Sequence, residues 1–153
     1  MTGPRLLLPV LLDVTGLRLL FVGAGEGTAT KLNALVDQNP PVRIVAPTVS
    51  PQVRTLAARL TDAEVRERPF TEDDLDGISL VYGMTDDEAV NTRLANLCRS
   101  RGLWTNVAHH RGPLSFSSPA VARGGGVIVA FSSEEGNPAV AVAARDSWIG
   151  GRE

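Results

Sequence analysis

The chain has 153 residues, of which 43% are hydrophobic, enough for one domain with a substantial core, and its formal net charge is −2. Its basic residues are scattered and form no block interleaved with aromatic residues, which disfavours nucleic-acid binding. Because the single cysteine, Cys98, cannot form an internal disulfide and no segment has the features of a membrane span or a cleavable signal, we expect a cytoplasmic protein with no membrane contact.

Residues 17–31 (LRLLFVGAGEGTATK) predict a strand, a glycine-rich turn and a helix. This order opens a nucleotide-binding βαβ unit, in which Gly23 permits the tight turn and Gly25 lets the backbone approach a pyrophosphate. The full pattern G-x-G-x-x-G expects Gly or Ala at position 28, where this chain has Thr28. A tight turn that binds nothing is therefore the alternative interpretation.

The chain from there to residue 107 alternates between strand and helix patterns. Ser50 and Pro51 are typical of a helix start, and an acidic turn at 71–77 has carboxylates that we expect to be solvated. Leu6 to Leu12 is expected to pack against the sheet or an edge. The predicted strands are 19–22, 42–46, 65–68, 78–82 and 103–107, and the predicted helices begin near residues 28, 51 and 89. The alternation predicts an α/β fold with a Rossmann-like, doubly wound parallel sheet.

The pattern changes after residue 108. Residues 119–122 and 127–131 predict a β-hairpin, and Asn137 and Pro138 predict the start of a last helix that runs to Ala144. This tail is too short for a large core of its own, so we expect it to form the contact of a homodimer.

The segments together resemble the NAD-dependent precorrin-2 dehydrogenase family, the dehydrogenase module of siroheme synthases. The resemblance rests on the order and spacing of LPVLLDVTG, VGAGEGTATK, IVAPTVSP, FTEDDLDG, TDD, TNV, ARGGGVIVAFSS and NPAVA, and it covers nearly the whole chain. It implies that residues 1–108 are a Rossmann-like NAD-binding domain and that residues 109–153 are a short β and helical dimerisation segment, truncated relative to the family. Members oxidise precorrin-2, a tetrapyrrole, to sirohydrochlorin, and some also insert iron.

The resemblance also implies which residues bind NAD. No acidic residue follows the second strand to bind a ribose 2′-hydroxyl, so the residues by themselves leave NAD and NADP open. A simple helix cap is the alternative role of Thr85 and Asp86. The implied cofactor-binding residues are Gly23, Gly25, Glu26, Gly27, Val45, Ala46, Pro47, Met84, Thr85 and Asp86.

The chain departs from the family where the family usually carries a catalytic aspartate, because His109 occupies that position. An imidazole titrates near pH 6.5, so His109 is a candidate catalytic proton acceptor. His110 and Arg111 follow, and this run could equally bind the carboxylates of a tetrapyrrole or a metal held within one. A loop that has lost its site is the third interpretation. We expect no metal site in the protein itself.

A second departure follows the hairpin, where Glu134 and Glu135 replace two glycines after the candidate substrate-binding Ser133. Their charge would oppose a polyanionic tetrapyrrole unless an arginine such as Arg123 or Arg145 compensates. The sequence therefore predicts an NAD-dependent precorrin-2 dehydrogenase. The alternative is a catalytically degenerate protein of the same fold that binds a nucleotide or a tetrapyrrole.

Overall fold

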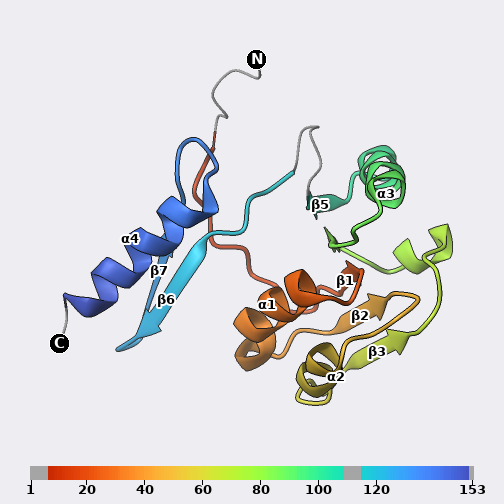
Figure 1. The fold of residues 1–153 in the computed structure, drawn as a ribbon, viewed down its shortest axis with the longest axis horizontal. Helices are drawn as coiled ribbons and strands as arrows, with labels where there is room; N and C mark the ends of the chain where they lie inside the picture. Colours follow the sequence, from red (N-terminus) through yellow and green to blue (C-terminus); the bar gives the residue numbers. More distant parts are fainter. Residues whose placement is uncertain (1–6, 109–114, 152–153) are drawn as a thin grey trace. The chain divides into compact units, whose positions relative to one another are not determined.

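The computed structural model describes residues 7–108 and 115–151 of the chain (Figure 1). The residues fall into two compact units. One comprises Asp13–Phe116, and the other joins the residues up to Leu12 to those from Ser117 onward. Residues 7–12 thus group with the C-terminal segment, whereas the sequence analysis assigned them to the sheet-containing domain.

The larger unit is built on a parallel sheet of five strands. These are β1 (Leu19–Val22), β2 (Val42–Val45), β3 (Ala63–Arg66), β4 (Leu80–Gly83) and β5 (Trp104–Val107). They lie in the order β3-β2-β1-β4-β5, and all four pairings are parallel. The connection from β1 leads outward to β2 and β3, and the chain then returns to place β4 on the other side of β1. The predicted Rossmann-like doubly wound sheet is confirmed, and its topological switch point lies between β1 and β4.

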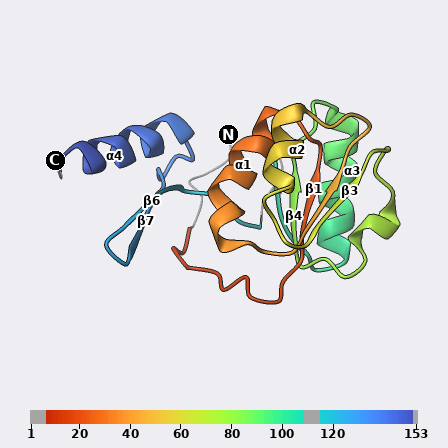
Figure 2. The same ribbon diagram turned by 90° about the horizontal axis from the view of Figure 1, so that it is seen from below.

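Helices cover both faces of this sheet (Figure 2). On one face α1 (Glu26–Leu35) and α2 (Pro51–Ala57) pack through Leu32 and Val53 against Phe21 and Ile44. On the other face α3 (Glu88–Ser100) packs through Leu94 and Cys98 against alternate strand residues such as Leu20 and Val81. Every residue of β1 and β4 is buried, because both faces of a central parallel strand lie under helices.

Most helices and strands begin and end within two residues of the predicted positions, because local signals in the sequence mark these ends. The Ser50 side chain accepts a hydrogen bond from the Val53 N–H at 3.3 Å, and Pro51 is the first residue of α2, as expected for a helix start. Short 3-10 turns, η1 (Val36–Gln38) and η2 (Glu72–Leu75), follow α1 and precede β4. Among the strands, β3 begins two residues before its predicted start and β4 two residues after, and β3 lies at the edge of the sheet as expected.

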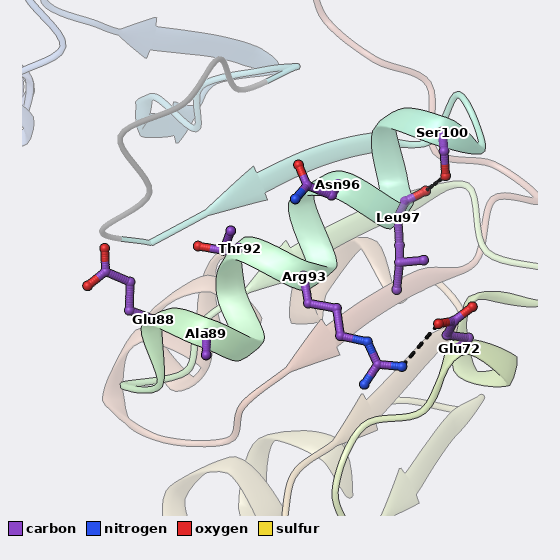
Figure 3. A pocket seen from close by; sticks show the side chains of 8 residues that line it. All are labelled: Glu72, Glu88, Ala89, Thr92, Arg93, Asn96, Leu97 and Ser100. Carbon is purple, nitrogen blue, oxygen red and sulfur yellow. Dashed lines mark hydrogen bonds and ion pairs between the residues drawn. The ribbon is translucent and has the colours of Figure 1, made fainter.

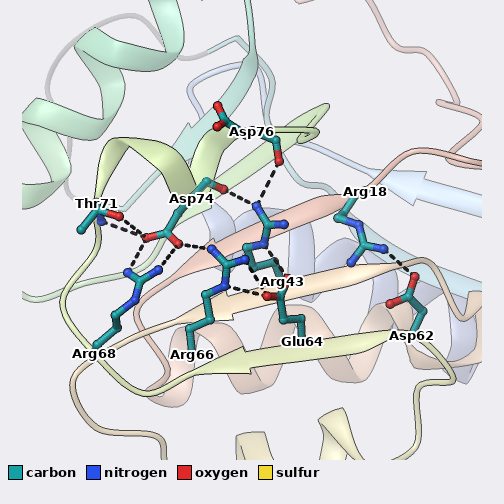
Figure 4. A network of polar contacts seen from close by, with 9 residues as sticks. All are labelled: Arg18, Arg43, Asp62, Glu64, Arg66, Arg68, Thr71, Asp74 and Asp76. Carbon is teal, nitrogen blue, oxygen red and sulfur yellow. Dashed lines mark hydrogen bonds and ion pairs between the residues drawn. The ribbon is translucent and has the colours of Figure 1, made fainter.

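The acidic turn at 71–77 corrects the sequence analysis, because one of its carboxylates is fully buried. The Asp74 side chain is 0% exposed and lies 2.6 Å from an Arg66 guanidinium nitrogen and 2.7 Å from one of Arg68 (Figure 4). It also accepts the Thr71 N–H at 2.8 Å. Burial raises the pKa of the Asp74 carboxyl, but Arg68, Thr71 and Arg66 outweigh that effect and hold the pKa well below its usual range. Glu72, Asp73 and Asp76 are exposed, as predicted.

The smaller unit contains an antiparallel hairpin and a helix. The hairpin consists of β6 (Ala120–Gly124) and β7 (Val127–Phe131), which confirms the prediction. The helix α4 (Pro138–Gly150) is capped by the Asn137 side chain and runs six residues beyond the predicted end at Ala144. It packs on both strands, with the Phe131 and Trp148 rings 6.0 Å apart.

Residues 7–12, the described part of the segment expected to pack against the sheet or an edge, group with the smaller unit. Leu8 is 82% exposed, Leu11 is 75% exposed and Val10 is 64% exposed. These side chains group with the smaller unit, where the buried apolar side chains among the described residues are the alanines Ala122 and Ala141. Such small side chains provide no core that could cover the larger apolar ones.

Candidate functional site

Gly23 directly follows β1 at the switch point and lies against Met84, which follows β4. Its φ of 100° belongs to the region that side chains avoid, and a Cβ atom added there would lie 2.4 Å from the Met84 carbonyl oxygen. The Met84 N–H donates to the Val22 carbonyl at 2.7 Å, and the Gly23 N–H donates to the Val45 carbonyl at 2.9 Å. The glycine therefore lets the segments that follow β1, β2 and β4 meet at one edge of the sheet.

The N-terminus of α1 follows this turn and is open to ligands. Gly25 is the N-cap and makes no side-chain hydrogen bond, so the first N–H groups of the helix have no side-chain partner. Gly25, Glu26 and Gly27 are exposed, and a Cβ atom added at Gly25 would meet nothing within 4 Å. A dinucleotide pyrophosphate fits such a turn, since free N–H groups and the helix dipole both favour an anion there. The Glu26 carboxylate, in the first turn, opposes this attraction.

Thr28 explains the departure from the glycine pattern. Its side chain is buried between α1 and β1, and its hydroxyl donates a 2.7 Å hydrogen bond to the Gly23 carbonyl. The third small residue of the pattern normally allows the helix to pack closely on the strand. Here the hydroxyl satisfies a carbonyl of the turn itself, so Thr28 stabilises the Gly23 conformation and is compatible with a nucleotide-binding turn.

Three residues at the end of β2 were predicted to bind the cofactor, and one of them is exposed to a ligand. Val45 is 0% exposed and Ala46 is 3% exposed, whereas Pro47 is exposed. Just beyond, the Ser50 N–H donates to the Ala24 carbonyl at 3.1 Å, which ties the start of α2 to the glycine turn. At this edge Pro47 can contact a ligand with its ring, and the two residues before it contribute to the core.

Met84, Thr85 and Asp86 follow β4. A Cβ atom added at Gly27 would lie 3.6 Å from the Met84 sulfur, so the Met84 side chain reaches the first turn of α1. The Thr85 hydroxyl accepts the Asp87 N–H at 3.2 Å, and Asp87, one residue later than the cap that the sequence analysis considered, is the N-cap of α3. Met84 and Thr85 are half-buried and border Gly23, whose added Cβ would lie within 3.0 Å of their backbone atoms, and Asp86, the next residue, is exposed.

Asn91 is a buried polar residue that the sequence analysis missed. It is 2% exposed, and its amide contacts residues in the segments after β4 and β5. The signal was available, because Asn91 occupies the helical face that Leu94 and Cys98 bury, where an amide is unexpected.

Ala108 follows β5 and is fixed at the same edge of the sheet. Its N–H donates to the Gly83 carbonyl at 2.8 Å. The described chain resumes at Ser115. The Ser115 N–H donates to the Thr105 carbonyl at 3.0 Å, and the Asn106 amide donates to the Phe116 carbonyl at 3.0 Å. The candidate residues His109, His110 and Arg111 lie outside the described residues, in the sequence between Ala108 and Ser115.

Ser133, the other candidate substrate-binding residue, lies in the smaller unit. Its carbonyl accepts the Gly136 N–H at 3.0 Å, so it helps to form the turn before α4. Glu134 and Glu135 are exposed, and within the described ranges no arginine or lysine pairs with them at 4.0 Å or less. Arg145, considered as a compensating charge, pairs with Asp146 at 2.7 Å.

A shallow hollow on α3 contains none of the predicted cofactor residues (Figure 3). Its floor is the outer side of the helix from Glu88 to Ser100, and an Arg93–Glu72 ion pair of 3.0 Å closes one side. No group of three or more His, Cys, Asp or Glu side chains that could hold a metal ion was found within residues 7–108 and 115–151. In the same ranges, none of the helices has the length and apolarity needed to cross a bilayer.

Comparisons with known proteins agree with the nucleotide-binding geometry. A family model described as "Putative NAD(P)-binding" matches residues 10–120. The siroheme synthase of Pseudomonas fluorescens (strain Pf0-1) is 34% identical over 145 residues, covering 93% of this chain and 31% of that protein. The siroheme synthase of Pseudomonas entomophila (strain L48) has the same identity and coverage. The chain therefore spans about a third of the length of these curated relatives.

A solved structure titled SirC, precorrin-2 dehydrogenase, superimposes with a TM-score of 0.78 at 23% identity, covering 93% of this chain and 69% of that one. This likeness shows the fold. The family model and the resemblance in sequence motifs coincide over the glycine turn and the β4 and β5 ends. The matching part of the siroheme synthases is a relative of the chain. The chain therefore belongs to this NAD(P)-binding family.

Proposed function

We propose that the chain is an NAD-dependent precorrin-2 dehydrogenase, which oxidises precorrin-2 to sirohydrochlorin. The observation that carries the proposal is the open glycine turn at the switch point, where Gly23 brings the β1 and β4 ends together and Gly25 leaves the α1 N-terminus uncapped. The name of the solved structure of the same fold and the siroheme synthase relatives support the substrate.

In this proposal the N–H groups of Glu26 and Gly27 hold the pyrophosphate, and Gly25 gives it room to approach. Met84, Thr85 and Asp86 border the nicotinamide end from β4, and Pro47 flanks the adenosine. When bound, the nicotinamide supplies a two-electron acceptor for hydride. The balance is precorrin-2 plus NAD⁺ giving sirohydrochlorin, NADH and one proton, so a group of the chain must accept that proton.

The charges around the β2 end support NAD over NADP. Recognition of a 2′-phosphate needs a free basic side chain near that strand end. Arg66, in register with Val45, pairs with Asp74, and Arg68 pairs with the same carboxylate. Arg54 on α2 pairs with Glu67 at 2.7 Å. These arginines already have carboxylate partners, which disfavours their use for a phosphate.

His109 is the proposed proton acceptor. It directly follows Ala108, which is hydrogen-bonded to Gly83 at the edge of the sheet where the nicotinamide end is proposed to bind. An imidazole near its ordinary pKa of about 6.5 can accept a proton at neutral pH, and it stands where the family usually carries a catalytic aspartate. His110, Arg111 and Ser133 are the proposed contacts with the tetrapyrrole carboxylates.

Incubation of the chain with precorrin-2 and NAD tests the proposal. We expect the absorbance of sirohydrochlorin and of NADH to rise together, and we expect His109→Ala to lower kcat while leaving NAD affinity unchanged. His109→Asp, which restores the family residue, is expected to keep turnover. Absence of turnover by the folded wild-type chain with substrate that a known dehydrogenase converts would refute the dehydrogenase function.

A catalytically degenerate binding protein is the second candidate, and Glu134 and Glu135 favour it. Their exposed carboxylates have no arginine or lysine partner among the described residues, so they would repel a polyanionic substrate. Calorimetry separates the candidates, because the second predicts tetrapyrrole or nucleotide binding without turnover. Incubation of sirohydrochlorin with ferrous iron, without NAD, separately tests iron insertion.

A homodimer is part of the proposal. In the smaller unit Val127, Ile128 and Val140 are each at least 45% exposed, and their unit has alanines as its buried apolar residues in the described part. A second copy of this unit would cover these side chains. Light scattering is expected to give twice the chain mass, and Ile128→Glu is expected to return the mass to that of one chain. A wild-type monomer at micromolar concentration would contradict this.

A further inference from the structure

Asn91 joins two loops of the candidate site through a single buried amide. Its Nδ2 donates to the Thr85 carbonyl at 2.8 Å and to the Ala108 carbonyl at 3.3 Å. Its Oδ1 lies 2.8 Å from the Thr85 hydroxyl. That hydroxyl also lies 3.0 Å from the Asp87 carbonyl, and its one proton can be donated to either acceptor. Both amide protons of Asn91 are thus used, one on each loop.

These contacts need an amide at this place. Asparagine is a weak helix former, and Asn91 lies on the face of α3 that Leu94 and Cys98 bury. A hydrophobic residue there would extend the core, but it would leave the Thr85 and Ala108 carbonyls without these donors. An aspartate of the same shape would place a carboxylate against two carbonyl oxygens. Packing within the core therefore does not explain an amide at position 91. The need to donate hydrogen bonds to the carbonyls of both loops does explain it.

We propose that Asn91 is a positioning residue for dinucleotide binding. It acts through Thr85 on the loop after β4, which borders the cofactor, and through Ala108 on the loop that leads to His109. Asn91 holds these two backbone segments at a fixed distance from each other. That distance determines the space between the two loops in which the dinucleotide is proposed to bind. This inference rests on the proposed function and assigns the residue no contact with the ligand.

Hydrogen exchange and calorimetry on Asn91→Asp test this role, with Asn96→Asp as the matched control. Asn96 is an exposed residue of the same helix, so the control adds the same charge and leaves the loops untouched. In Asn91→Asp we expect the Ala108 amide to exchange about tenfold faster and NAD to bind about tenfold more weakly, as the loss of both donors predicts. Exchange at Phe21, in the central strand, should stay as in the wild type, and the KM for NAD should rise about tenfold.

Asn91→Ala provides a second variant, because alanine favours the helix itself and any loosening then comes from the missing amide. Unchanged Ala108 exchange in the folded variants would overturn the proposal, and so would faster exchange with unchanged NAD affinity. If the wild-type chain binds no NAD, the proposed function fails independently. The exchange measurement then still decides whether Asn91 joins the two loops.

Discussion

Replacing Gly23 by alanine is expected to destabilise the protein strongly, whereas the same change at Gly25 should affect binding alone. At Gly23 the φ of 100° costs an alanine about 1–3 kcal/mol. The new Cβ would also lie 2.4 Å from the Met84 carbonyl oxygen, and relieving such an overlap in a packed region costs about 1–3 kcal/mol more. The free energy of unfolding should therefore fall by roughly 2–6 kcal/mol.

Gly25→Ala is the matched control for this change. Its φ is −95° and the added Cβ meets nothing within 4 Å, so the free energy of unfolding should change by no more than about 1 kcal/mol. The methyl group would, however, occupy the space in which the pyrophosphate is proposed to lie, and we expect NAD affinity to fall at least about tenfold.

Urea unfolding followed by circular dichroism measures the first effect, and calorimetric titration with NAD measures the second. A loss of roughly 2–6 kcal/mol at Gly23 corresponds to a midpoint lower by about 1–3 M urea, with a urea dependence of about 2 kcal/mol per M. Equal stability of Gly23→Ala and the wild type would refute the close approach of the β1 and β4 ends. Unchanged NAD affinity in Gly25→Ala would refute the proposed place of the pyrophosphate.

Three further predictions concern Asp74, Glu26 and Thr28. Asp74→Asn should lower the free energy of unfolding by about 1–3 kcal/mol at pH 7, because it removes the buried charge that pairs with two arginines, which are themselves 28% and 41% exposed. Since the folded-state pKa of Asp74 lies below the unfolded value of about 3.9, its contribution is present above pH 4 and is lost as the pH falls further. Urea midpoints measured from pH 7 to pH 2 should therefore fall more steeply for the wild type than for the variant, and parallel curves would contradict the ion pairs. Glu26→Gln should tighten NAD binding by a factor of about 2–5 in calorimetry at low salt, with the gain reduced at high salt, because it removes a negative charge beside the proposed pyrophosphate. A gain that is independent of salt would argue against this electrostatic cause. Thr28→Val should cost about 1–2 kcal/mol in urea unfolding, whereas Thr28→Ser, which keeps the hydroxyl donor to Gly23, should cost less; the reverse order would contradict the hydrogen bond.

Local sequence signals predicted the elements of the larger unit because their causes are local. The apolar run at 19–22 predicted a buried strand, and Ser50 with Pro51 predicted a helix start that the structure confirms. The glycines of the turn were identified from their position between strand and helix. In each case the residues within one or two turns of the chain determine the conformation, so one sequence suffices.

The sequence misplaced the polar residues whose partners come from other elements. Asp74 was predicted to be solvated because, although Arg66 and Arg68 lie eight and six residues before it, no local pattern shows that the chain turns back to place its carboxylate against them. Asn91 was not identified, since Ala108, 17 residues away, becomes its neighbour once β5 lies beside β4. The exposed position of residues 7–12 was likewise hidden, because an apolar run does not reveal whether a surface exists to cover it.

By itself, the sequence determined the strand and helix alternation, the glycine turn and the departure at His109 from the family aspartate. Tertiary structure decided the rest: the order β3-β2-β1-β4-β5, which brings Gly23 to Met84, and the burial of Asp74 and Asn91. The physical reason is the range of the interactions. Hydrophobic periodicity and helix caps act within an element, whereas a buried carboxylate or amide is stable only where the fold brings hydrogen-bond partners from other elements to it.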